Sequence, residues 1–125
     1  MIETPLRLEH LTKRPQFLAA AKGLSSARGA VLCQMLPRGD GDDVVRVGFT
    51  ATKRLGGAVV RNRAKRRLRH AARQVLSELG KPGADYVFIA RQGAATRPWE
   101  RLVEDMQRAL LSLGPKPDTP RSPKL

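Results

Sequence analysis

Short apolar segments separated by turn-forming residues predict three β-strands. In the clearest of them, residues 44–52, every second side chain is apolar and faces one way: Val45, Val47, Phe49 and Ala51. Residues 30–36 and 85–91 form the other two predicted strands, and the latter is entered through a Lys-Pro-Gly turn. Residues 24–29 lack such a pattern and are expected to form a loop.

Three further segments have the spacing of helices. The first runs between Thr12, a plausible N-cap, and Gly23, and it carries Phe17. The second spans residues 58–79, and the third begins at Pro98 with an apolar stripe that includes Trp99. The predicted order is α-β-β-α-β-α, which is typical of an α+β, two-layer α/β sandwich. Residues 1–113 are expected to form one α/β domain, and the proline-rich residues 114–125 a disordered tail.

The central helix has one apolar face. At ~100° per residue its apolar positions fall within an arc of ~100°: Val60, Ala64, Leu68, Ala71, Val75 and Leu79. Basic residues cover most of the remaining surface. A helix lying on an anionic membrane would share this pattern, but the apolar face has no aromatic anchor, and neighbouring strands are available to cover it.

Charge is concentrated in the same region. The 125 residues include 24 Lys+Arg and 11 Asp+Glu, a formal net charge of +13. No acid occurs between Asp43 and Glu78, yet that interval holds ten bases, nine of them within residues 51–73. Like charges on neighbouring helical turns repel by ~0.2–0.5 kcal/mol per pair, so such a block is expected to be neutralised by a polyanion. Its arginines favour phosphate, which guanidinium groups bind through two parallel hydrogen bonds.

Other chemistry is mostly excluded by composition. The apolar runs are far shorter than the ~20 residues that span a bilayer, and the first 22 residues lack the apolar core of a secretion signal, so a cytoplasmic protein is expected. Cys33 has no partner for a disulfide and is predicted to be a buried thiol. The acidic cluster at residues 40–43 is interpreted as a solvated turn, and His70 lacks a second ligand at metal-binding spacing. No metal site and no protein nuclease site are predicted.

Residues 53–66, Lys-Arg-Leu-Gly-Gly-Ala-Val-Val-Arg-Asn-Arg-Ala-Lys-Arg, closely resemble the signature of the bacterial ribonuclease P protein subunit. The flanking strands and an N-terminal helix bearing Phe17 agree with that family, and the resemblance covers roughly residues 6–113. It implies a ribosomal-protein-S5-domain-2-like fold with a left-handed βαβ crossover, which the general preference for right-handed crossovers would not suggest.

The resemblance also implies a function. The protein would join a large catalytic RNA, which holds the Mg²⁺ ions and cleaves the 5′ leader from precursor tRNA, so that ribonuclease P is an endoribonuclease only as a holoenzyme. The predicted RNA-binding residues are Lys53, Arg54, Arg61, Asn62, Arg63, Lys65, Arg66, Arg67, Arg69 and Arg73. The predicted leader cleft consists of Phe17, Arg46, Thr50 and Lys53.

Two alternatives stay open at this point. Composition and periodicity fit equally a non-catalytic, ribosome-associated RNA-binding protein, from which only the Arg-Asn-Arg signature separates the chain. Asn62 could contact RNA or could make local backbone bonds in the first turn of the helix.

The chain also departs from the family that it resembles, whose members often have an aromatic residue where Ala21 stands. Fewer aromatics mean less base stacking, so the leader is expected to be held more by charge.

Overall fold

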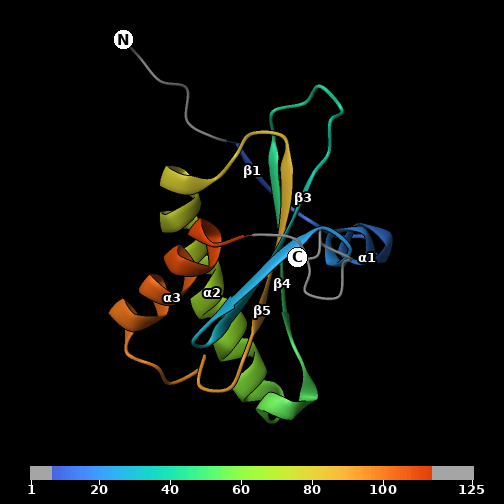
Figure 1. The fold of residues 1–125 in the computed structure, drawn as a ribbon. Coiled ribbons are helices and arrows are strands. Elements are labelled where there is room, and N and C mark those ends of the chain that lie inside the picture. Colours follow the sequence, from blue (N-terminus) through green and yellow to red (C-terminus); the bar gives the residue numbers. More distant parts are fainter. Residues whose placement is uncertain (1–6, 114–125) are drawn as a thin grey trace, which may run out of the picture.

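A five-stranded sheet organises the computed structural model, which describes residues 7–113 (Figure 1). The strands lie in the order β1-β4-β5-β3-β2. Their bounds are β1 Leu8–His10, β2 Leu24–Arg28, β3 Val31–Pro37, β4 Val45–Ala51 and β5 Ala84–Ala90. Strands β1, β4 and β5 are mutually parallel, whereas β3 pairs antiparallel with both β5 and β2. The predicted tail, residues 114–125, lies outside the described residues.

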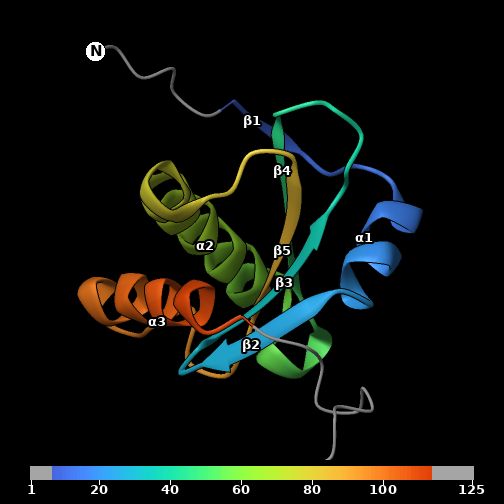
Figure 2. The ribbon, with the colours of Figure 1, turned by 45° about the horizontal axis from the view of Figure 1, so that its top comes forward.

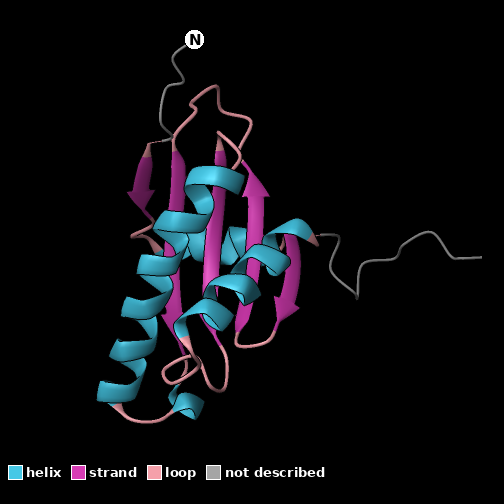
Figure 3. Ribbon diagram, turned by 90° about the vertical axis from the view of Figure 1, so that its left-hand side faces the viewer, coloured by secondary structure: helices cyan, strands magenta, loops and turns pink. Residues whose placement is uncertain are grey.

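Helices lie on both faces of the sheet (Figures 2 and 3). Helices α2 (Ala58–Leu79) and α3 (Trp99–Leu111) cover one face, and α1 (Arg14–Ala21) lies against the other. The main core fills the space between the sheet and α2 and α3, where Phe88, Leu68, Leu102 and Met106 are fully buried. A smaller apolar cluster under α1 contains Leu11, Ala20 and Val87, with Phe17 and Ile89 at its margin.

The α+β class and the central elements agree with the sequence prediction, but the predicted element order omitted two strands. Strand β2 was expected to be a loop because Leu24–Arg28 contains small and polar residues without alternation. It forms because the turn at Gly29, with φ +53°, folds it back onto β3. Strand β1 is only three residues long, and all of them are exposed, so no apolar pattern marks it. The α1 layer also makes the fold more than a two-layer sandwich.

Helix α2 begins and ends where predicted, but its buried face is rotated. Ala72 and Leu76 are buried, whereas Val60 is 38% exposed. Trp99 was predicted to lie in the core and is 40% exposed instead. The unit β4–α2–β5 joins two parallel neighbours through a helix, and the hand of this crossover stays a prediction. None of the helices within residues 7–113 is both long and apolar enough to cross a membrane.

Candidate nucleic-acid interface

The segment between β4 and α2 turns the chain out of the sheet and exposes basic side chains to solvent. A short 3-10 helix, η1 (Lys53–Leu55), follows β4, and Leu55 packs against the core while Lys53 and Arg54 are exposed. Gly56 has φ +141°, a conformation that a side chain would strain. Gly57 then caps α2 without a side-chain hydrogen bond. The tight turn thus places two basic side chains beside the first turn of the helix.

Basic side chains cover the exposed surface of α2. Asn62, Arg63, Arg66, Arg69 and Arg73 are exposed, whereas Arg61 and Lys65 are partly buried. Every ion pair formed within residues 7–113 involves bases outside the block at 53–73. The described part of the chain therefore leaves the block without a carboxylate partner, and a phosphate-bearing ligand would supply the missing charge.

Arg67 differs from its neighbours. Its guanidinium donates to the carbonyl oxygen of Ala94 at 2.7 Å and to that of Arg97, and it lies over the ring of Trp99 at 5.9 Å. Burial, and then the like charge of Arg63, lower the pKa of Arg67. Arg67 was predicted to bind RNA, but two of its donors hold the loop before α3 against α2. We therefore leave Arg67 out of the interface.

Arg69 is held near the sheet by a different contact. Its guanidinium carbon lies 5.7 Å from the centre of the Phe49 ring, and Phe49 in turn stacks on Phe88 at 5.9 Å. The cation–π contact fixes the plane of the guanidinium without using its N–H groups. Arg69 is thus oriented and still able to donate hydrogen bonds.

Three of the predicted cleft residues, Phe17, Arg46 and Thr50, lie on the opposite, α1 face of the sheet, whereas Lys53 lies in η1. Phe17 projects from α1 onto β4, where a Cβ at Gly48 would lie only 2.4 Å from its ring. Gly48 is therefore the residue that lets the aromatic ring approach the strand closely. Thr50 follows two residues later on the same face and pairs with Ile89 of β5. Phe17 and Thr50 therefore lie on one face of the sheet, and their role in a leader cleft stays a prediction.

Arg46 also lies on this face, but it is bound to a buried acid. Its Nε and Nη2 donate to the two carboxylate oxygens of Asp85, each at 2.8 Å. Arg38 donates to the same carboxylate at 2.9 Å, and it also binds Asp40. Hydrogen bonds to Asp85 raise the pKa of Arg46. For Arg38, burial opposes the charge, but hydrogen bonds to Asp40 and Asp85 outweigh it and raise the pKa. The network ties β4, β5 and the residue after β3 together, and it holds Arg46 in place by one edge of its guanidinium.

A groove opens at the end of this face where β4 and β5 stop. It has a volume of ≈650 Å³ and is lined by the following residues: Thr52, Lys53, Arg54, Leu55, Ile89, Ala90, Arg91 and Gln92. Arg91 and Gln92 were not among the predicted site residues. Their only sequence signal is their position directly after β5, which becomes informative once β4 and β5 are known to be parallel and to end together. The groove adjoins the basic turn at η1, so one strip of charge runs from the sheet to α2.

The buried thiol and the exposed acidic turn are both present, as predicted. Cys33 is fully buried, and burial raises the pKa of its thiol well above the usual range. Asp40 and Asp42 accept hydrogen bonds from Arg38 and Arg7 within the exposed turn. Nowhere in residues 7–113 do three His, Cys, Asp or Glu side chains come together in a way that could hold a metal ion.

Comparison with known proteins agrees with this geometry. The family model described as Ribonuclease P matches residues 6–114. The chain is 60% identical over 115 residues to the ribonuclease P protein component of Caulobacter vibrioides, covering 90% of this chain and 77% of that protein. It is 49% identical over 110 residues to that of Ruegeria pomeroyi, covering 86% and 88%. Among solved structures, the RNase P protein of Staphylococcus aureus matches with a TM-score of 0.68 and 26% identity over 82% of this chain and 92% of the other. That of Thermotoga maritima matches with a TM-score of 0.67 and 25% identity over 80% and 93%.

Proposed function

The chain belongs to the ribonuclease P protein family, and from this premise we propose that its basic surface on η1 and α2 binds the catalytic RNA of the holoenzyme. As a ribonuclease P protein component it takes part in tRNA processing. In our proposal the RNA subunit removes the 5′ leader from precursor tRNA, and the protein assists by binding that RNA and the leader. No protein side chain takes part in the bond cleavage.

One observation carries the proposal: the basic block has no carboxylate partner within the described residues, although the chain has acids that pair with arginines elsewhere. Lys53, Arg54, Arg63, Arg66 and Arg69 are all exposed. Their N–H groups can donate hydrogen bonds to the phosphates of a folded RNA. The regular geometry of α2 fixes the spacing of Arg63, Arg66 and Arg69. This block supports RNA binding more strongly than the net charge alone does. Phosphates that bind to it would remove the repulsion among its own basic side chains.

For the leader, we propose a path along the α1 face of the sheet. Phe17 offers an aromatic ring, Thr50 a hydroxyl, and Lys53 and Arg91 positive charge at the end of the strands. A single-stranded leader needs these two elements, a stacking platform and a charged groove. Arg46 is left out of this path because one edge of its guanidinium, formed by Nε and Nη2, is bound to the carboxylate of Asp85.

Magnesium belongs to the RNA in this proposal. The described acids are scattered or engaged: Asp85 binds two arginines, and Asp105 binds the backbone nitrogen of Ala30. Metal ions that activate water for phosphoryl transfer need several converging oxygen ligands. The phosphates of the RNA subunit supply such ligands, and the protein's bases would stabilise the fold of the RNA around them.

Reconstitution tests the proposal. Cleavage of precursor tRNA by a bacterial ribonuclease P RNA is measured at low Mg²⁺ with and without the full-length protein. We expect the wild-type protein to raise the cleavage rate, and Arg66→Ala to require more protein for the same effect. Arg101→Ala, which removes one exposed charge from α3, is the matched control. RNA binding without any stimulation would overturn the proposal and favour a non-catalytic RNA-binding protein.

Leader length tests the second surface. If charge holds the leader, each added nucleotide should increase substrate affinity mainly at low salt, since counterion release weakens with salt. Affinity is measured for precursor tRNAs with leaders of increasing length at two salt concentrations. A large gain from leader bases that persists in high salt would contradict a charge-based grip.

A further inference from the structure

A second pocket lies on the other face of the sheet, between the edge strand β1 and helix α2. Its volume is ≈160 Å³, and Leu8, His10, Val47, Phe49, Arg69, Ala72 and Arg73 line it together with Glu9. A cavity of about 150 Å³ in another protein accommodates one benzene ring. The pocket therefore has room for one flat ring and not for an extended strand.

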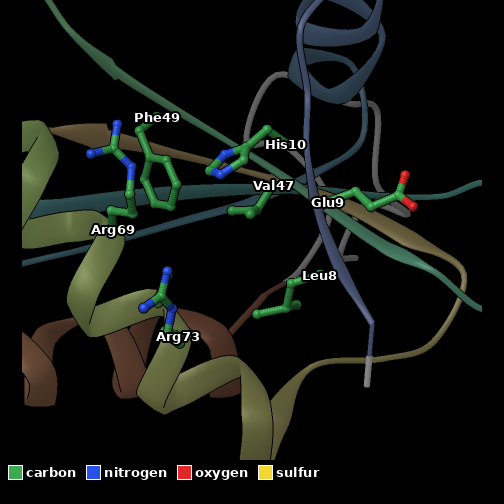
Figure 4. A pocket seen from close by; sticks show the side chains of 8 residues that line it. Leu8, Glu9, His10, Val47, Phe49, Arg69 and Arg73 are labelled. Carbon is green, nitrogen blue, oxygen red and sulfur yellow. The ribbon is translucent and has the colours of Figure 1, made fainter. Parts of the chain in front are cut away.

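The pocket combines apolar walls with a cationic rim (Figure 4). Val47 and Phe49 come from the sheet, and Leu8 and His10 project toward them from β1, whereas the carboxylate of Glu9 points away. Because side chains of a strand alternate, Leu8 and His10 share one side and Glu9 takes the other. The short strand thus presents its apolar and imidazole groups to the pocket and keeps its acid outside.

Two guanidinium groups flank the opening. Arg69 and Arg73 lie one helical turn apart on α2, and both line the pocket. Neither forms an ion pair within residues 7–113. Like charges at this spacing repel, so an anion between them relieves the repulsion. The guanidinium of Arg69 also lies over the ring of Phe49, 5.7 Å from its centre, so that a cation and an aromatic ring stand together in the wall of the pocket.

We propose that this pocket takes one unpaired nucleotide of the RNA that α2 binds, with the base between Leu8, Val47 and the stacked Phe49–Arg69 pair, and its phosphate between Arg69 and Arg73. This inference rests on the proposed function, since it assigns one more contact to the same helix. It adds base insertion to an interface whose other contacts go to phosphates. It also gives β1 a role: the strand closes the pocket with Leu8 and His10.

Mononucleotides test the pocket on the protein alone. Full-length protein is titrated with uridine 5′-monophosphate, whose base is a single ring, and with ribose 5-phosphate, and binding is followed by NMR. We expect uridine 5′-monophosphate to bind about tenfold more tightly, which is the effect of one base–aromatic contact. The largest chemical-shift changes should occur at Leu8, His10 and Val47. Equal affinity for the two probes would overturn the proposal, because charge alone would then explain the binding.

Two variants separate the base from the phosphate. Ala72→Leu fills the pocket from α2 without changing its charge, and it should abolish the preference for uridine 5′-monophosphate while ribose 5-phosphate binding stays within twofold. Arg73→Gln should weaken both probes, whereas Arg101→Gln, the same charge change on α3, should affect neither. If Ala72→Leu fails to fold, Leu8→Ala replaces it, because Leu8 is 36% exposed and its truncation removes one wall. An unchanged preference in the folded pocket variant would refute base insertion.

The holoenzyme distinguishes this inference from the proposed function. With the catalytic RNA, Ala72→Leu should raise the protein concentration needed for half-maximal cleavage by about tenfold, yet reach the wild-type rate at saturation. If wild-type protein fails to stimulate cleavage, the proposed function fails, whatever the mononucleotides show. If the wild type stimulates and Ala72→Leu behaves identically to it, the pocket proposal fails alone.

Discussion

Replacing Asp85 with asparagine is expected to destabilise the fold while leaving the RNA-facing charges unchanged. The Asp85 side chain is 4% exposed, and those of Arg38 and Arg46 are 6% and 27% exposed. Its carboxylate accepts hydrogen bonds from both guanidinium groups, at 2.9 Å from Arg38 and 2.8 Å from Arg46. Asparagine has nearly the same shape, so Asp85→Asn removes the negative charge without opening a cavity.

The magnitude follows from burial and from the hydrogen bonds that survive. Removing one partner of a buried ion pair costs ~3–5 kcal/mol. We expect the lower end, ~3 kcal/mol, because Arg38 keeps Asp40 and the carbonyl oxygens of Asp42 and Val44. Unfolding entropy of ~2.1 cal/mol/K per residue gives ~0.22 kcal/mol/K for the ~107 described residues. The melting temperature should therefore fall by ~13 °C.

Thermal unfolding by circular dichroism measures this change, with urea unfolding as a second probe. Asp43→Asn is the matched control, since Asp43 is an exposed acid nearby, and its melting temperature should equal that of the wild type. A double-mutant cycle with Arg46→Met should show coupling of ~1–3 kcal/mol, as expected of contacting residues. A destabilisation below ~1 kcal/mol for Asp85→Asn, or strict additivity with Arg46→Met, would refute the reasoning and return Arg46 to the candidate leader contacts.

Other predictions concern the arginines of α2 and the buried thiol. Arg63→Ala and Arg66→Ala should each weaken RNA binding and lower the slope of log K against log salt by ~0.7 for each phosphate that the variant no longer neutralises; unchanged slopes would show that these side chains face solvent in the complex. Arg67→Ala should leave the slope unchanged and lower the free energy of unfolding by ~1–3 kcal/mol, because the buried carbonyl of Ala94 loses its donor. Equilibrium unfolding and a salt titration of RNA binding distinguish the two roles. Cys33 should react with a thiol reagent only as fast as the protein unfolds, since it is fully buried and its pKa is raised; rapid labelling of the native protein would contradict that burial.

Periodicity predicted the parts of the fold that bury one regular face. The bounds of α2 and the alternation of β4 were correct because each has a long run of apolar positions on one side. Strands β1 and β2 were not predicted, because an edge strand is held by backbone hydrogen bonds that any sequence can make. Leu24–Arg28 is placed by its pairing with β3, and Leu8–His10 by its pairing with β4. In both cases the placement depends on a partner strand, so the local pattern does not reveal it.

The sequence predicted the position of the basic surface better than it predicted the role of each residue in it. The absence of acids between Asp43 and Glu78 located the basic surface correctly. The pocket beside β1 could not be predicted, because it requires the strand that the pattern missed. The exposure of Trp99 was also missed: the spacing of α3 predicts a buried residue, but Trp99 lies at the first position of the helix. At that position the guanidinium of Arg67 lies over the ring of Trp99.

The different roles of the arginines follow from direction and register rather than from residue type. Arg67 and Arg69 are two positions apart, so at ~100° per residue they point ~200° apart around α2. Arg67 meets the carbonyl of Ala94, whereas Arg69 meets the ring of Phe49 and solvent. Arg46 is bound because the parallel register of β4 and β5 places it opposite Asp85. A shift of one residue in that register would turn either side chain to the other face of the sheet and release Arg46 as a ligand-binding charge. Direction around α2 for Arg67 and Arg69, and sheet register for Arg46, therefore decide which of these arginines are held by the protein and which stay open to a ligand.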